Sequence, residues 1–169
     1  MAEAANPMGR ALAAYDFEVE PALWADLDAC GALATALPSQ ARAEWECLAL
    51  HACVRGLVAA AGFGDSTADA IDAMHEIVLE QWACGPGEAT FSARRTRLAE
   101  RYAEYGRIGQ ELESDGADII AAALGTAAAA HVFAPASSPE GAASMLADLH
   151  AAMTDGATEV ARRLAVAGA

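Results

Sequence analysis

The stretch from Ser39 to Gly62 constrains the fold more than any other part of the chain. It predicts one long helix, capped by Ser39 after Pro38 and ended by Gly62. Placed at 3.6 residues per turn, its side chains form two apolar faces, one of large and one of small residues. The large face holds Leu50, Val54, Leu57 and Val58, with Cys47 and Cys53 at its margins, and the small face holds Ala49, Ala52, Gly56, Ala59 and Ala60. A helix that is apolar over most of its circumference has neighbours on several sides, so we expect it at the centre of the fold.

Helical periodicity recurs along the rest of the chain, and no stretch alternates apolar and polar residues as a strand would. The acidic segment 16–20 is interpreted as a connector, because Pro21 favours a new helix start. The other predicted helices cover residues 7–15, 21–37, 67–84, 90–113, 116–133 and 139–166. The sequence therefore predicts an all-α, single-domain bundle of six or seven helices around the central helix 39–62. The domain would span residues 1–169, with residues 1–6 frayed.

Charge narrows the classes of partner. The chain has 24 acidic and 10 basic residues, a net charge of −14 at pH 7. Nucleic acids and anionic membrane surfaces attract clustered positive charge, so we expect neither as a partner. No signal peptide or membrane-spanning run is visible, which predicts a cytoplasmic location. All basic residues are arginine, which is typical of a GC-rich bacterial genome rather than of a function.

The sequence contains only loose candidates for metal ligands. The four cysteines, Cys30, Cys47, Cys53 and Cys84, lack C-x-x-C spacing and are interpreted as small core residues. His75 follows Asp72 in a single D-x-x-H pattern, whereas a di-iron bundle needs two E-x-x-H helices and further carboxylates. Cys47 and His51 would supply two ligands where a closed site needs about four. We therefore expect no metal and no cofactor.

A polar stripe of Glu44, His51 and Arg55 runs along the predicted central helix. An acid, an imidazole and a guanidinium on one line could orient a proton transfer or hold an anionic ligand, which makes them ligand-binding candidates. The alternative is that the stripe is the solvent-exposed edge of the helix, with Arg55 extended over apolar neighbours.

Three further side chains are ligand-binding candidates. His75 lies at the margin of an apolar helix face, and His131 lies within the most apolar helix. Tyr102 lies on the core face of helix 90–113. Each has an ordinary alternative as a buried polar residue with one hydrogen bond. Four histidines converging on one cavity would be far more informative, and the sequence alone leaves that open.

The basic residues Arg94, Arg95, Arg97 and Arg101 form the one concentration of positive charge in the sequence. They are candidates for binding an anion such as a phosphate or carboxylate. The alternative is that they pair with the acidic stripe between Asp69 and Glu80 on the preceding helix.

No nucleophile elbow, phosphate-binding glycine loop or metalloprotease motif is present. The leading hypothesis is therefore a non-catalytic helical binding or interaction protein that self-associates into a homo-oligomer. Small-residue faces and surplus apolar helix surface favour self-association. The alternative is a small-molecule-binding protein, or an enzyme, with a pocket between helices lined by histidine and arginine.

Overall fold

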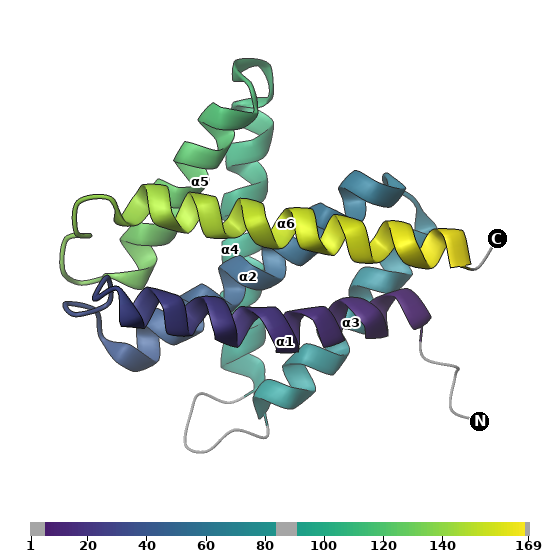
Figure 1. Cartoon of the computed structure of the whole chain (residues 1–169), viewed down its shortest axis with the longest axis horizontal. Coiled ribbons are helices and arrows are strands. Elements are labelled where there is room, and N and C mark those ends of the chain that lie inside the picture. The colour runs from purple at the N-terminus through teal and green to yellow at the C-terminus, as the bar shows by residue number, and fades with distance from the viewer. Residues whose placement is uncertain (1–5, 84–90, 168–169) are drawn as a thin grey trace.

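The structure, a computed structural model, describes residues 6–83 and 91–167. They form six α-helices and one 3₁₀ helix. The elements are α1 (Pro7–Ala29), α2 (Pro38–Ala61), α3 (Asp65–Ala83), α4 (Phe91–Glu111), η1 (Glu113–Asp115), α5 (Ala117–Val132) and α6 (Ala142–Ala167). Figure 1 shows α1 and α6 running alongside each other in front of α2, with α4 and α5 crossing behind them and projecting to one side. The predicted all-α bundle is confirmed.

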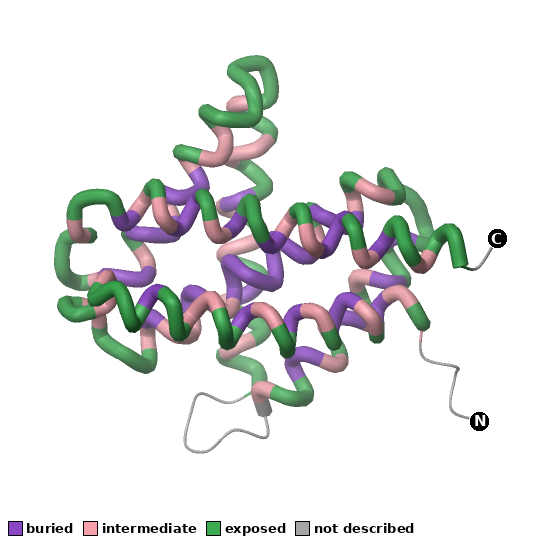
Figure 2. The backbone as a smooth tube through the Cα atoms, viewed as in Figure 1, coloured by how far each residue is buried: buried purple, intermediate pink, exposed green. Residues whose placement is uncertain are grey.

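Helix α2 lies at the centre, as its two apolar faces predict. It contacts each of the other five α-helices. Trp45, Leu48 and Leu50 have no exposed surface, and Leu57 is 1 % exposed. Figure 2 shows the buried part of the chain concentrated along α2 and on the sides of α1 and α6 that face inward. Burial of these side chains is worth about 1.5–3 kcal/mol each.

The small-residue face of α2 is occupied by α6. A side chain at Gly56 would collide with the backbone oxygen of Thr154 and with Ala157, so the glycine permits the two helices to approach closely. Thr158 also donates a hydrogen bond to the carbonyl oxygen of Gly56 at 3.2 Å. This face is therefore used within the chain, and it no longer argues for self-association.

The predicted break in the N-terminal region is wrong. Helix α1 runs without interruption through the segment 16–20 and through Pro21. Pro21 lacks the N–H that would bond the carbonyl of Phe17, but both residues are exposed, so water can reach that carbonyl. The buried face that begins at Leu12 and Ala13 continues through Asp16 and Glu20 to Leu27. Packing of the apolar part of this face against the bundle outweighs the local signal for a break.

The helix caps predicted from the sequence are correct in part. The predicted Asn6 cap is confirmed, since its side chain accepts hydrogen bonds from the N–H groups of Met8 and Gly9. Asn6 is therefore not frayed, and residues 1–5 and Cys84 lie outside the described residues. The cap of α2 is Leu37 rather than Ser39, and it makes no side-chain hydrogen bond to the helix. Across the described ranges, no helix combines the length and apolarity that a membrane crossing needs.

Candidate functional site

Three of the four histidines, from three different helices, form a chain of contacts that passes through Tyr102 of α4. His51 Nδ1 of α2 lies 3.0 Å from His150 Nε2 of α6. His75 Nε2 of α3 lies 2.9 Å from the Tyr102 hydroxyl. The ring centres of His51 and Tyr102 are 5.5 Å apart in an edge-to-face arrangement. These three histidines therefore belong to one network of contacts, but none of the three pockets described below is lined by more than one of them.

Burial keeps this histidine cluster uncharged at neutral pH. It lowers the pKa of His51 to about 3, with further lowering from His150 and Arg55. It likewise lowers the pKa values of His75 and His150 to about 4. Burial raises the pKa of Tyr102 well above its usual value. Each hydrogen bond in the cluster thus joins two neutral groups, one donating and the other accepting.

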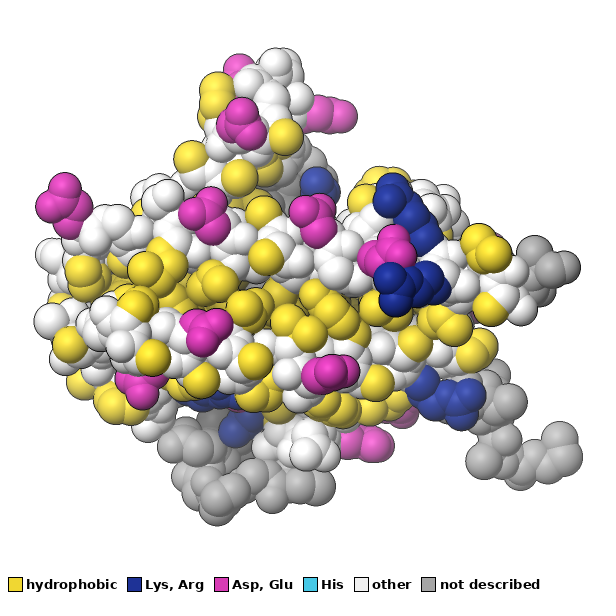
Figure 3. Space-filling model, viewed as in Figure 1, with side chains coloured by type: hydrophobic (Ala, Val, Ile, Leu, Met, Phe, Trp, Pro, Cys, Tyr) yellow, Lys and Arg dark blue, Asp and Glu magenta, His cyan; other side chains and the backbone are white. Residues whose placement is uncertain are grey.

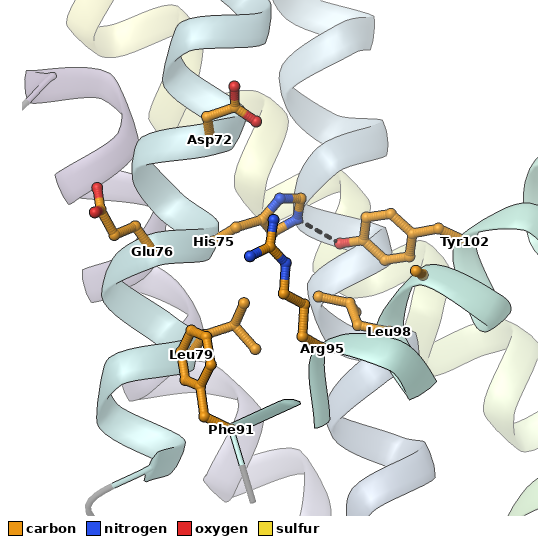
Figure 4. Close-up of a pocket in the computed structure, with 9 residues that line it drawn as sticks. Asp72, His75, Glu76, Leu79, Phe91, Arg95, Leu98 and Tyr102 are labelled. Carbon is orange, nitrogen blue, oxygen red and sulfur yellow. Dashed lines mark hydrogen bonds between the residues drawn. The ribbon is translucent and has the colours of Figure 1, made fainter. Parts of the chain in front are cut away.

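A pocket of about 550 Å³ opens between α3 and α4 beside the His75–Tyr102 pair. Figure 4 shows the Tyr102 hydroxyl directed at His75. Arg95 of α4 also lines the pocket. Asp72 and Glu76 add two carboxylates from α3. The apolar lining consists of Leu79, Phe91, Leu98 and Ala99. We call this the α3–α4 pocket.

A second pocket, of about 540 Å³, lies where α2, α4 and α5 meet. His51 and Arg55 line it, together with Tyr105. The Tyr105 hydroxyl is buried and has no hydrogen-bond partner among the residues that the structure describes. Each of the two pockets is thus lined by a different histidine of the cluster, the α3–α4 pocket by His75 and the second pocket by His51.

The polar stripe of α2 is not a solvent-exposed edge. Glu44 and His51 are buried, at 4 % and 6 % exposure, and only Arg55 is exposed. Glu44 can be buried because Arg101 of α4 donates two hydrogen bonds to its carboxylate, at 2.6 and 3.1 Å. The crossing of α4 over α2 supplies this partner, which a pattern within one helix cannot reveal.

The four clustered arginines divide between two sides of α4, and their predicted pairing with Asp69–Glu80 is not what the structure shows. Three of them face α2: Arg94 lies 3.7 Å from Glu46, Arg97 lies 3.5 Å from Glu44, and Arg101 pairs with Glu44 as above. Arg95 instead lines the α3–α4 pocket with Asp72 and Glu76. Because α4 crosses α2 near the first turns of α2, the acids closest to the arginines are Glu44 and Glu46 of α2.

His131 lies outside the histidine cluster. Its Nε2 is 2.7 Å from a Glu104 carboxylate oxygen, and both side chains are about a quarter exposed. Glu104 also lies 3.6 Å from Arg101. His131 therefore belongs to the charged network that includes Glu44, rather than to either pocket described above.

The buried acids Asp16 and Glu20 were not predicted as site residues, because both lie in the segment that was expected to be a connector. Asp16 Oδ1 accepts a hydrogen bond from the Cys53 thiol at 3.9 Å, and Glu20 accepts one from Arg42 at 2.6 Å. Burial and the neighbouring Glu20 carboxylate raise the pKa of Asp16 to about 7. Burial also raises the pKa of Glu20 to about 7, against the lowering effect of Arg42. The available signal was the helical spacing of Leu12, Asp16 and Glu20.

His150 was also not among the predicted site residues, although its place beside apolar positions of its helix is visible in the sequence.

Comparison of the chain with protein-family models, with curated proteins and with solved structures found no match. The chemistry of the pockets is then the basis for assigning a function.

Proposed function

We propose that this protein is a non-catalytic small-molecule-binding protein whose ligand occupies the α3–α4 pocket. The observation that carries the proposal is the His75–Tyr102 hydrogen-bonded pair at a pocket of about 550 Å³. Ligand sites in proteins are typically apolar clefts of roughly 300–1,000 Å³ with a few fixed polar groups. The pair is held in place by its own hydrogen bond, so its orientation does not depend on the ligand.

The protonation states favour binding over acid–base catalysis. A general base works best with a pKa near the operating pH. Burial instead lowers the pKa of His75 to about 4 and raises that of Tyr102 well above its usual value. At neutral pH the imidazole is a weak base and the phenol a weak acid, so the pair is suited to recognising a polar group.

The lining favours a ligand with a cationic group and an apolar part. Among the described lining residues, Asp72 and Glu76 supply two carboxylates, against one positive charge from Arg95. Leu79, Phe91 and Leu98 form the apolar side, which Figure 4 shows at the opposite end of the pocket from Asp72. The net charge of −14 attracts cations to the protein as a whole. A small aromatic amine has these properties.

Benzylamine is a suitable probe, with benzoate as its anionic counterpart. We expect benzylamine at millimolar concentration to shift the backbone amide resonances of residues 72–79 and 98–102, and benzoate to have a smaller effect. Ala99→Trp should abolish the response, because Ala99 is exposed and lines the pocket. Ala103→Trp is the matched control, since Ala103 is exposed one turn along α4 and lines none of the pockets described here.

The proposal fails if benzylamine causes no shift in these segments. It also fails if Ala99→Trp, folded by circular dichroism, responds to benzylamine as the unmodified protein does.

We also propose that the protein self-associates through the rim of the α2–α4–α5 pocket. Phe63 is 90 % exposed there, and the adjoining lining includes Val54, Val58 and Ile120. An exposed aromatic ring beside an apolar hollow favours burial against a second copy. Sedimentation at micromolar concentration should show a dimer that Phe63→Ser dissociates. Val166→Ser is the control, because Val166 is 81 % exposed and does not line this pocket. A sharply monomeric unmodified protein would exclude this proposal.

A further inference from the structure

A third pocket, of about 390 Å³, lies between α1, α2 and α4, and three arginines line it. Among the described residues of its lining are Arg42, Arg94 and Arg97, with one acid, Glu46. Trp24 and Ser39 complete the polar and aromatic part of the lining. The described lining holds three guanidiniums and one carboxylate, and just outside it Glu20 pairs with Arg42 and Glu44 lies 3.5 Å from Arg97. We call this the arginine pocket.

Two of these guanidiniums have hydrogen-bond donors to spare. Each arginine has five N–H donors. Arg94 approaches Glu46 only to 3.7 Å and Arg97 approaches Glu44 only to 3.5 Å, and neither donates a hydrogen bond within the described part of the chain. Both acids already accept shorter hydrogen bonds from other arginines, Glu46 from Arg42 and Glu44 from Arg101. The carboxylates are shared, and they leave Arg94 and Arg97 free to bind a further anion.

Contacts with neighbouring aromatic rings orient two of the arginines. The Arg42 guanidinium lies 5.2 Å from the ring centre of Trp24, and that of Arg94 lies 5.8 Å from the ring centre of Trp82. Such cation–π contacts hold the guanidinium groups over the ring faces. They reduce the freedom that these long side chains would lose on binding a ligand.

The first turn of α2 borders the same pocket through Pro38 and Ser39. The N-cap Leu37 makes no side-chain hydrogen bond to the helix, so the N–H groups of Ser39 and Gln40 have no capping acceptor. The positive end of the helix dipole adds to the field of the three arginines. It strengthens an anion site that the arginines already define.

We propose that the arginine pocket binds the phosphate group of a small phosphorylated molecule. A phosphate monoester carries about −1.5 to −2 charges at pH 7 and has three acceptor oxygens, which can accept hydrogen bonds from the spare donors of Arg94 and Arg97. Planar guanidinium groups bind phosphate through paired hydrogen bonds. Trp24 offers an apolar surface for the organic part. This site is separate from the α3–α4 pocket, which has two carboxylates and one arginine.

Calorimetric titration with phenyl phosphate at fixed ionic strength tests the proposal, and inorganic phosphate forms a second arm. Arg97→Gln and Arg94→Gln should each weaken binding by about tenfold or more, since each removes charge-assisted hydrogen bonds. Arg95→Gln is the matched control, because Arg95 is adjacent in sequence and lines the other pocket. Tighter binding of phenyl phosphate than of inorganic phosphate would support an organic phosphate as ligand. Equal affinities would support free phosphate at the same site.

Amide resonances provide a readout that does not depend on the stability of the variants. Phenyl phosphate should shift the N–H signals of Ser39 and Gln40 in the unmodified protein. No binding at millimolar phenyl phosphate would overturn the proposal. Equal weakening by Arg95→Gln and Arg97→Gln would also overturn it, because that result indicates nonspecific attraction to positive charge.

Discussion

The buried acids of α1 and the buried histidines around Tyr102 lie against α2 and respond to pH in opposite directions. Burial raises the pKa values of Asp16 and Glu20 to about 7, and it lowers those of His51 and His150 to about 3 and 4. In both groups burial disfavours the charged form. An acid becomes neutral by keeping its proton, whereas a histidine becomes neutral by losing it.

The consequence for stability follows from the protons bound in each state. Between pH 4 and 7 the folded protein retains protons on Asp16 and Glu20 that the unfolded chain releases, so these acids lower the stability as the pH rises. Between pH 6.5 and 4 the unfolded chain binds protons on the histidines that the folded protein excludes. The histidines therefore lower the stability as the pH falls. The two groups offset each other in mildly acidic solution, which makes the stability of the whole protein a poor indicator of either.

Asp16→Asn should have the largest effect, because it removes the acid with the greater rise in pKa. A rise of about three pKa units corresponds to about 4 kcal/mol, so the variant should be more stable than the unmodified protein by up to about 4 kcal/mol at pH 8. At pH 4 the difference should nearly vanish. Urea unfolding at the two pH values measures it, with the exposed Asp28→Asn on the same helix as control. If Asp16→Asn is less stable than the unmodified protein at pH 8, burial of the Asp16 carboxylate does not destabilise the folded protein.

Glu44 provides a contrast to the acids of α1, since it is buried with arginine partners on α4. Arg101→Met should destabilise the protein by about 3 kcal/mol, because it leaves a buried carboxylate without its hydrogen-bonded partner. The matched change, Arg107→Met, removes an exposed pair with Glu111 and should cost about 0.5 kcal/mol. Chemical unfolding at pH 7 distinguishes the two. Equal losses would mean that burial of Glu44 does not depend on its pairing.

His51→Gln tests the predicted loss of stability as the pH falls. Replacing one histidine of low pKa should reduce the loss of stability between pH 6.5 and pH 4.5 by about 2 kcal/mol relative to the unmodified protein. Urea unfolding across this range gives the slope. Combining His51→Gln with Asp16→Asn should flatten the pH profile on both sides. An unchanged slope in the single variant would show that His51 is protonated in the folded protein.

Tyr102→Phe should have the smallest effect, a loss of about 1 kcal/mol for the hydrogen bond to His75. The Nε2 resonance of His75 reports whether the bond exists. If that resonance is the same in the variant, the pair is not formed, and the proposed ligand site loses its central feature.

The sequence allowed the helical class and the place of α2 to be predicted, because both depend on periodicity within short segments. The choice of Asn6 as a cap was equally local. The course of α1 was not predictable in this way, since Pro21 and the acids around it indicate a break. Burial of Leu12, Ala13 and Leu27, which lie before and after this segment, favours one continuous helix over two.

The candidate sites were also predictable only in part. His75, Tyr102 and the four clustered arginines were identifiable by residue type and spacing, but their partners were not. His75 meets Tyr102 across a turn and a helix, and His51 meets His150 almost a hundred positions away in sequence. Neighbouring arginines, Arg94 and Arg95, face different pockets because adjacent positions on a helix point about 100° apart.

By itself the sequence determined that this chain forms an acidic bundle of helices with an apolar rod at the centre. Hydrophobic periodicity is a property of each segment, and it is sufficient to specify which face of a helix is buried. The crossing of the helices decided which polar groups are buried together, and therefore which are neutral, which are paired and which have donors to spare. Those outcomes depend on distances between residues far apart in the chain, and such distances exist only once the helices have packed.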